Sequence, residues 1–284
     1  MADPVLVYEV GPRDGLQNEA GFVPSAQKIA LVDALSQAGL RKIEVTSFVS
    51  PRWVPQLADA ATVLDGITRR AGVVYAALTP NLRGAEDALC AKAGEIAIFA
   101  SASESFSQKN INCSIAESLK RFAPVLELAG SAGIPVRGYV SCVTDCPYEG
   151  LVAPAAVADV ARRLAALGCY EISLGDTIGA ATPASTAAML DAVLAVLPAT
   201  RLAGHFHDTS GRALDNIDVC LNRGIRTFDA AAGGLGGCPY APGAKGNVAT
   251  ELLVDHLESR GLATGIDRTA LERAAVLARQ LRTS

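Results

Sequence analysis

Two of the chain's three histidines stand one residue apart, in the stretch GHFHDTSG at residues 204–211. Successive side chains of a β-strand point to opposite faces, so residues i and i+2 share a face. On a strand, His205 and His207 would therefore lie side by side and could hold one metal ion between them. On a helix or in a loop the two imidazoles would diverge. The chemistry of this pair thus depends on the element that carries it.

Further polar residues lie at the ends of runs that are otherwise apolar. A charged side chain inside such a run is costly unless it is paired or bound to a ligand. If these ends meet in the fold, they form the polar cluster that a metal site or a catalytic site requires. The residues are Arg13 and Asp14 after the first run, Glu44 in the second, Asp176 at the end of the sixth, and Cys238 and Asn247 in the glycine-rich stretch after the eighth.

Eight short, nearly continuous apolar runs alternate with segments of helical composition. Strands buried on both faces have this composition, and a regular strand–helix alternation is typical of parallel α/β proteins. Eight such units in 284 residues predict an α/β fold with a single (β/α)8 barrel, the TIM barrel. An open doubly wound sheet is disfavoured because no GxGxxG motif opens the first helix. The runs are residues 5–10, 42–48, 73–78, 95–101, 135–141, 170–176, 201–208 and 227–234.

The barrel gives the histidine pair a defined place, because active sites of such barrels form at the carboxyl ends of the strands. GHFHD ends the seventh strand, and Asp14 follows the first, which only the eighth strand separates from the seventh. An aspartate, two histidines and an oxygen donor such as asparagine suit a divalent cation of the Mg²⁺, Mn²⁺ or Zn²⁺ type. The alternative is a pair of structural histidines, hydrogen-bonded inside the barrel.

Local signals predict where several elements begin and end. Ser25 is expected to cap the first helix, and Pro154 to occupy the first turn of a later one. We expect residues 101–118 to form an enlarged loop at the barrel mouth, and residues from about 265 to 284 a helical tail within one domain spanning 1–284. Glycines that close helices in a left-handed conformation are expected at Gly39, Gly94, Gly133, Gly168 and Gly224.

Composition excludes several classes of function. Half of the residues are apolar, 19% are charged, and the net charge is −4, which gives no basic surface for nucleic acid. No apolar run of about 18 residues is free of charge, so we expect no membrane span. The N-terminus lacks the features of a secretory or transit peptide, which predicts a cytoplasmic protein. Seven scattered cysteines without a CxxC pair indicate reduced, mostly buried thiols.

Several of these motifs carry a resemblance. The run VGPRDGLQNE resembles the first-strand signature of metal-dependent barrel lyases and synthases that make or break carbon–carbon bonds beside an acyl-CoA or keto acid. With CYEISLGDTIG, GHFHDT and GGLGGCPYAPGAKGNVATE, the chain is similar to the hydroxymethylglutaryl-CoA lyases over nearly its whole length. The synthases share the Arg-Asp and His-x-His elements but not the cysteine loop.

The resemblance implies a divalent metal ion, Mg²⁺ or Mn²⁺, and a retro-Claisen cleavage. In that family, 3-hydroxy-3-methylglutaryl-CoA gives acetoacetate and acetyl-CoA, a step of leucine breakdown and ketone-body formation. A metal beside the C3 hydroxyl favours loss of its proton. The enolate left on the thioester needs a fixed donor, and a permanently charged guanidinium suits it. The implied metal ligands are Asp14, His205, His207 and Asn247.

The same resemblance assigns roles to further side chains. Arg13 would stabilise the enolate, and Cys238, in a glycine-rich loop able to close over the substrate, would protonate it. Glu44 and Asp176 would be acid–base partners or would orient the metal ligands. His205 belongs to the catalytic residues as well as to the metal ligands. The implied contacts with the acyl-CoA substrate are Gln17, Ser47 and Asn110.

Other interpretations stay open. A lyase for a longer 3-hydroxy-3-alkylglutaryl-CoA would carry the same motifs, and an acyl-CoA condensing synthase would carry most of them. A zinc hydrolase is disfavoured because such barrels place the HxH pair after the first strand. A barrel that binds a ligand without catalysis is disfavoured because Arg13, Asp14, His205 and Cys238 are all present. The family also suggests a homodimer or larger homo-oligomer.

Overall fold

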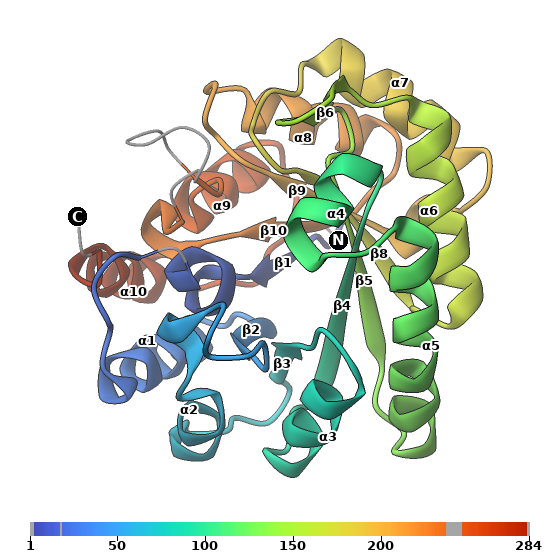
Figure 1. The fold of residues 1–284 in the computed structure, drawn as a ribbon. Coiled ribbons are helices and arrows are strands. Elements are labelled where there is room, and N and C mark those ends of the chain that lie inside the picture. Colours follow the sequence, from blue (N-terminus) through green and yellow to red (C-terminus); the bar gives the residue numbers. More distant parts are fainter. Residues whose placement is uncertain (1–2, 18, 237–245, 283–284) are drawn as a thin grey trace.

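The computed structural model describes residues 3–17, 19–236 and 246–282. Within these residues, eight parallel strands close into a barrel in the order β1-β10-β9-β8-β5-β4-β3-β2, and helices surround it (Figure 1). Each strand falls inside one of the eight apolar runs, so the predicted TIM barrel is confirmed. The strands are β1 (Leu6–Glu9), β2 (Lys42–Ser47), β3 (Val74–Leu78), β4 (Glu95–Ser101), β5 (Val136–Ser141), β8 (Glu171–Asp176), β9 (Leu202–Phe206) and β10 (Thr227–Ala230).

Ten α-helices are present among the described residues. A small antiparallel hairpin, β6 (Asp145–Cys146) and β7 (Gly150–Leu151), follows β5. None of the helices in the described part of the chain is long and apolar enough to cross a membrane. The helices are α1 (Ser25–Gln37), α2 (Ala60–Gly66), α3 (Leu82–Cys90), α4 (Glu104–Ile111), α5 (Ile115–Ser131), α6 (Pro154–Leu167), α7 (Pro183–Leu194), α8 (Ala213–Asn222), α9 (Thr250–Ser259) and α10 (Arg268–Gln280).

The enlarged loop expected at residues 101–118 is wrong, because most of this stretch is helical. Two serines cap two successive helices: Ser103 accepts a hydrogen bond from the Phe106 N–H, and Ser114 accepts one from the Glu117 N–H. Side-chain caps of this kind satisfy backbone donors that a helix start leaves free. Asn110 therefore lies in the last turn of α4, exposed to solvent, and not in a loop.

Two smaller expectations are also corrected. Ser25 is the first residue of α1 and not its cap; its hydroxyl donates to Asp59 Oδ2 at 2.6 Å, and Pro24 precedes the helix. Lys92, not Gly94, adopts the left-handed conformation after α3, with φ 62°. The glycine at position 94 thus correctly indicated a left-handed turn after α3, but the residue that adopts this conformation is Lys92. Pro154 begins α6 as expected.

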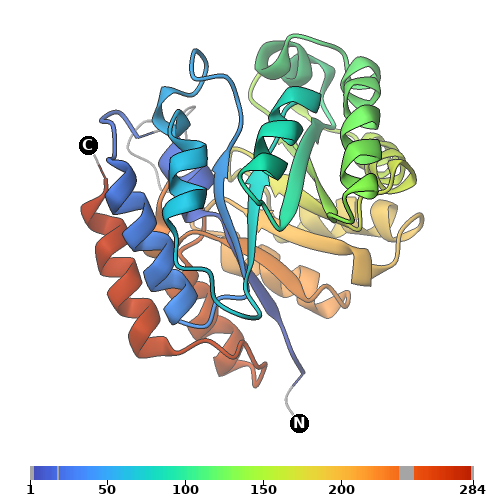
Figure 2. The same cartoon turned by 90° about the horizontal axis from the view of Figure 1, so that it is seen from below.

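The C-terminal helix is part of the barrel wall. The apolar face of α10, which includes Ala270, Leu271 and Ala274, is buried, and the helix packs against α1 and α9. Figure 1 shows α10 beside α1, so that the last helix closes the ring next to the first. Figure 2 shows the same two helices lying side by side at one edge of the molecule. The predicted helical tail is thus a packing element.

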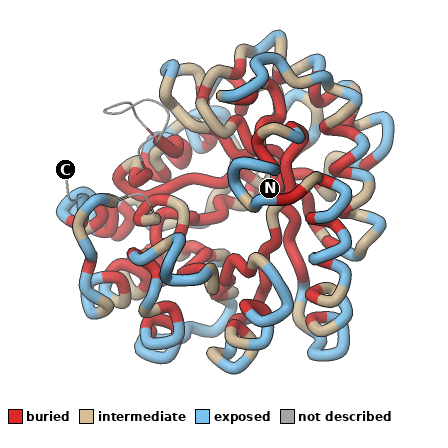
Figure 3. The backbone as a smooth tube through the Cα atoms, in the orientation of Figure 1, coloured by how far each residue is buried: buried red, intermediate tan, exposed pale blue. Residues whose placement is uncertain are grey.

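The barrel contains two kinds of buried surface. Ile43 and Val45 of β2 join the apolar core that Leu31 and Leu35 of α1 also line. Glu44, between them, is fully buried among polar groups instead. Figure 3 shows that the strands are buried along most of their length while the outer faces of the helices are exposed. Polar side chains inside the barrel are therefore shielded from water, which strengthens their mutual interactions.

Candidate metal centre and active site

One turn of the backbone brings two of the predicted residues to the carboxyl end of β1. Directly after β1, residues Gly11–Gly15 form a π-helical turn in which the Asp14 and Gly15 N–H groups both donate to the Val10 carbonyl. Single π-helical turns are frequent at functional sites. The turn places Arg13 and Asp14 at the end of β1, where β10 is the neighbouring strand and β9 the next.

The three candidate metal ligands Asp14, His205 and His207 lie together. One ligand atom from each lies within 4.8 Å of the others. The Asp14 Oδ2 atom is 4.0 Å from His205 Nε2 and 3.9 Å from His207 Nε2. The two imidazole centroids are 5.4 Å apart, as expected for residues i and i+2 of a strand. The chain therefore presents a constellation of one carboxylate and two imidazoles that could hold a metal ion.

The fourth candidate ligand reaches the cluster through a returning segment of chain. Asn247 pairs in an antiparallel bridge with His207, and the Asp208 N–H donates to the Gly246 carbonyl at 2.7 Å. The Asn247 Nδ2 atom donates to Asp14 Oδ2 at 2.8 Å. A hydrogen bond thus joins Asp14 to Asn247, although the two residues are 233 positions apart in the sequence. The donor set of carboxylate, two imidazoles and an amide fits a divalent cation.

Arg13 connects this cluster to the barrel interior. Its Nη1 donates to Asp14 Oδ1 at 2.5 Å, and its Nε donates to Glu44 Oε2 at 2.6 Å. The Tyr139 hydroxyl donates to the same Glu44 oxygen at 3.2 Å. The other oxygen of Glu44, Oε1, is buried and has no hydrogen-bond partner among the described residues. A buried acceptor without a partner is costly.

Charges set the protonation states in this site. Burial pushes the pKa of Asp14 upward, but Arg13 and the two imidazoles outweigh burial and hold that pKa well below its usual value. For Glu44, burial is the stronger effect and raises the pKa, although Arg13 opposes it. The surrounding carboxylates raise the pKa of Arg13 further, against the effect of burial. Arg13 is therefore a permanent cation beside an anionic Asp14.

Asp176 lies at the end of β8 and is tied to the following loop. Its two oxygens accept hydrogen bonds from the Ala180 and Ala181 N–H groups, each at 3.1 Å. Burial raises its pKa to about 6, while these two amides and the His207 charge oppose the rise. A carboxyl group with this pKa exchanges a proton close to neutral pH. The position is compatible with acid–base work as well as with holding the loop.

The remaining predicted residues are more scattered. Ser47 ends β2 with its hydroxyl buried and, in the described part of the chain, without a hydrogen-bond partner. Gln17 is half-buried one turn after Asp14. Cys238 lies outside the described residues. The structure therefore brings together Arg13, Asp14, Glu44, His205, His207 and Asn247.

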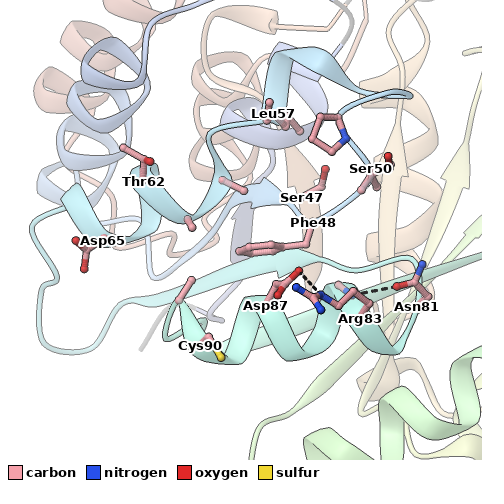
Figure 4. A pocket seen from close by; sticks show the side chains of 17 residues that line it. Ser47, Phe48, Ser50, Leu57, Thr62, Asp65, Asn81, Arg83, Asp87 and Cys90 are labelled. Atoms are coloured by element: carbon pink, nitrogen blue, oxygen red, sulfur yellow. Dashed lines mark hydrogen bonds and ion pairs between the residues drawn. The ribbon is translucent and has the colours of Figure 1, made fainter.

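A cavity of about 760 Å³ lies between the outer helices α2 and α3 (Figure 4). Its wall includes Ser47 and Phe48 at the end of β2, and Asn81 and Arg83 at the start of α3. Ser47 is the member of the predicted site that lines it. Asp14, His205 and His207 do not line this cavity.

Comparison with known proteins agrees with the geometry. A family model described as HMGL-like matches residues 5–277, which is nearly the whole chain. The chain belongs to the HMGL-like family. It is 58% identical over 263 residues to the mitochondrial hydroxymethylglutaryl-CoA lyase of Gallus gallus, covering 93% of this chain and 88% of that protein. The resemblance seen in the sequence motifs is thereby confirmed.

Two further members of the HMGL-like family bear on the site. A Pseudomonas aeruginosa protein named 3-hydroxy-3-isohexenylglutaryl-CoA/hydroxy-methylglutaryl-CoA lyase is 58% identical over 267 residues, covering 94% of this chain and 89% of that one. The crystal structure of the HMG-CoA lyase from Brucella melitensis superimposes with a TM-score of 0.99 at 57% identity, covering 100% of both chains. The fold of this chain is therefore that of the family throughout.

Three polar residues of this HMGL-like barrel were missed by the sequence interpretation. Arg137 and Tyr139 on β5 and Asp229 on β10 are buried and lie directly beneath or beside the site. The available signal was the same as for Glu44, a charged residue inside an apolar strand. Apart from Glu44, the signal was applied only to residues at or after strand ends, and Arg137 and Asp229 lie within strands.

Glu9 holds together the two loops that flank the site, and it carries a pH-dependent prediction. Its buried carboxylate accepts hydrogen bonds from the Gly11 N–H, the Ala232 N–H and the Thr250 hydroxyl. Burial raises its pKa to about 7, despite these three donors. The folded state thus holds a proton that the unfolded chain releases near the ordinary pKa of 4.5. Glu9 therefore contributes most stability at low pH and loses it as the pH rises towards 7.

Replacement of Glu9 by glutamine is expected to remove this pH-dependent contribution to the free energy of unfolding. The unfolding free energy of the wild type should fall through this group by up to about 3 kcal/mol between about pH 5 and about pH 7.5, because each pKa unit corresponds to about 1.4 kcal/mol. Glu9→Gln should show a flatter profile. The check is denaturant unfolding of both proteins at the two pH values. Equal pH slopes in the two proteins would contradict the prediction.

Proposed function

We propose that this protein cleaves 3-hydroxy-3-methylglutaryl-CoA to acetoacetate and acetyl-CoA as a divalent-metal-dependent carbon–carbon lyase. The observation that carries the proposal is the position of Arg13, which bridges Glu44 and the carboxylate of the Asp14, His205 and His207 constellation. The names of relatives that are 58% identical over more than nine tenths of the chain support it. We further propose that the whole chain acts as one catalytic domain.

Asp14, His205, His207 and Asn247 would hold the divalent cation, which we propose is Mg²⁺ or Mn²⁺. When bound, such an ion supplies Lewis acidity that favours ionisation of the C3 hydroxyl of the substrate. Asp14 is anionic and is fixed by hydrogen bonds from Arg13 and Asn247, so it is ready to bind a cation without rearrangement. Prearranged charges of this kind need no reorganisation during the reaction.

The other side chains would handle the electrons and protons of the cleavage. As the C2–C3 bond breaks, its electron pair passes to the thioester as an enolate, and Arg13 can stabilise the charge because its guanidinium remains protonated. Asp176, whose pKa is about 6, can take the hydroxyl proton. Glu44 holds Arg13 in place. Cys238 would return a proton to the enolate carbon, giving acetyl-CoA.

The substrate contacts are proposed from position. We propose as substrate contacts Ser47 at the end of β2, Gln17 three residues after Asp14, and Asn110, which is exposed on α4. The expected partner is an acyl-CoA, with no nucleic acid or membrane. We also propose a homo-oligomeric, cytoplasmic protein acting in leucine degradation. A Mus musculus relative that is 58% identical over 263 residues is named a cytoplasmic 3-hydroxy-3-methylglutaryl-CoA lyase.

A coupled assay of acetyl-CoA and acetoacetate release tests the proposed reaction. Activity should vanish with a chelator and return with Mg²⁺ or Mn²⁺. Cys238→Ala should lower kcat by about 10²–10⁴-fold, the usual contribution of a positioned acid, while metal binding stays at the wild-type level. Cys90→Ala is the matched control, since this thiol is exposed on α3. No cleavage with any metal would overturn the proposed substrate.

A longer 3-hydroxy-3-alkylglutaryl-CoA is the second candidate substrate, because the Pseudomonas aeruginosa relative is named for both an isohexenyl and a methyl compound. The same assay with both acyl chains decides between them through the ratio of their kcat/KM values. The condensation direction, from acetyl-CoA and a keto acid, is tested by product analysis. A clear preference for the longer chain or for condensation would replace the methyl substrate.

A further inference from the structure

His205 makes contacts on both sides of its imidazole ring. Its Nε2 atom faces Asp14, 4.0 Å from Oδ2, on the side of the proposed metal site. Its Nδ1 atom lies 3.1 Å from Oδ2 of Asp229. This second contact follows from the register of the barrel, because His205 on β9 pairs directly with Asp229 on β10. Neither residue can move away without disturbing the strand pairing.

Asp229 is surrounded by donors. The Arg137 guanidinium binds it in a bidentate manner, with Nη2 2.7 Å from Oδ1 and Nη1 3.1 Å from Oδ2. The Ser173 hydroxyl donates to Oδ2 at 2.8 Å. Asp229 and Arg137 are both almost completely inaccessible to water. On its other side, Arg137 donates from Nε to Glu171 Oε2 at 2.8 Å. A fully buried, charge-paired carboxylate thus stands behind one imidazole of the site.

We infer that Asp229, held by Arg137, is a positioning residue that fixes the tautomer of His205 and keeps its Nε2 atom free to bind a cation. The inference rests on the metal site of the proposed function. It assigns the buried Arg137–Asp229 pair a role in preparing that site before any ligand arrives.

The tautomer follows from the hydrogen-bonding capacities of the groups. An ionised carboxylate can only accept, and a guanidinium can only donate. Oδ2 of Asp229 therefore carries no proton, and Nδ1 of His205 must donate the hydrogen bond between them. A neutral imidazole has one N–H, so Nε2 keeps its lone pair and points it towards Asp14. Metal-binding histidines in other proteins are oriented by carboxylates in this way.

Asp229→Asn should reverse the tautomer while nearly preserving the side-chain shape. The amide oxygen is drawn to the guanidinium of Arg137, which leaves the NH₂ group facing His205. Nδ1 of His205 then has to accept, and the proton moves to Nε2, where it blocks cation binding. The affinity for Mn²⁺ should fall by about 10–100-fold, the range seen when the carboxylate behind a metal-binding histidine is lost.

Glu171→Gln is the matched control. Like Asp229→Asn, it removes one negative charge beside the Arg137 guanidinium. Glu171 contacts Arg137 but, among the described residues, is not hydrogen-bonded to His205. Binding of Mn²⁺ to wild type and both variants is followed by the electron paramagnetic resonance signal of the free ion. The expected result is weaker binding in Asp229→Asn and wild-type binding in Glu171→Gln. Equal binding in all three proteins, or an equal loss in both variants, would overturn the inference.

The tautomer itself provides a second readout that needs neither metal nor activity. The chain has three histidines, so ¹⁵N-histidine labelling gives a spectrum that His207→Gln and His256→Gln variants can assign. In metal-free wild type, His205 should carry its proton on Nδ1; in Asp229→Asn it should carry it on Nε2. A wild-type Nε2–H tautomer would overturn the inference, even if Asp229→Asn does not fold. If wild type binds no Mn²⁺ while His205 is the Nδ1–H tautomer, the metal site fails and the positioning by Asp229 stands.

Discussion

Arg13→Gln is expected to lower kcat for cleavage of 3-hydroxy-3-methylglutaryl-CoA by about 10²–10³-fold, the usual cost of removing one fixed donor from a developing negative charge. Arg13 is placed for this role because it is buried, permanently charged and held by Glu44 and Asp14. A donor that acts mainly in the transition state affects kcat more than KM. Steady-state kinetics with saturating metal measure the effect.

Two further variants separate the charge of Arg13 from its geometry. Arg13→Lys keeps the charge but cannot hold Glu44 and Asp14 through two separate nitrogens, so its kcat should lie between those of wild type and Arg13→Gln. Arg83→Gln is the control, since this exposed arginine on α3 pairs with Asp87 away from the constellation. Its kinetics should match wild type. An Arg13→Gln enzyme with wild-type kcat would exclude Arg13 from the chemistry.

Loss of the carboxylate at position 14 should weaken metal binding strongly. Asp14 is the shared partner of the site, because it contacts Arg13, Asn247 and both imidazoles. Asp14→Asn removes the only negative charge among the proposed ligands, so the affinity for Mn²⁺ should fall by at least about 100-fold, the upper end of the loss caused by outer contacts alone. Lyase activity should fall in parallel and recover in part at high metal concentration.

The control for this experiment is Asp65→Asn, which removes an exposed carboxylate on α2. Calorimetric titration with Mg²⁺ and Mn²⁺ gives the affinities of all three proteins. Asp65→Asn should bind like wild type. Wild-type affinity in Asp14→Asn would show that the ion is held elsewhere, and the proposed ligand set would then be wrong.

The sequence was sufficient for the barrel. Eight apolar runs with helical segments between them admit few other folds, because each strand must be buried on both faces and each helix must cover its neighbour. It was also sufficient for the order of the ligands around the mouth, since closure of eight parallel strands puts the first beside the eighth. The position of the His205–His207 pair on one strand face followed from the same period of two.

Only the tertiary structure decided how these residues contact one another. The caps Ser103 of α4 and Ser114 of α5 are local signals, and the sequence interpretation did not use them. The meeting of Asn247 with Asp14 depends on a chain segment that returns to pair with the end of β9. No sequence pattern specifies such a pairing.

The contacts among Arg137, Asp229 and His205 likewise combine residue types that the sequence indicates with pairings that only the tertiary structure decides. The sequence marked each as a polar residue within or beside an apolar strand, and burial of such a residue requires a partner. Which partner it finds depends on the register of β9 against β10 and on the distance across the barrel interior. The sequence therefore determined the fold and the chemical types at its mouth. The closed barrel decided which charge compensates which, because residues far apart in the chain share one low-dielectric interior.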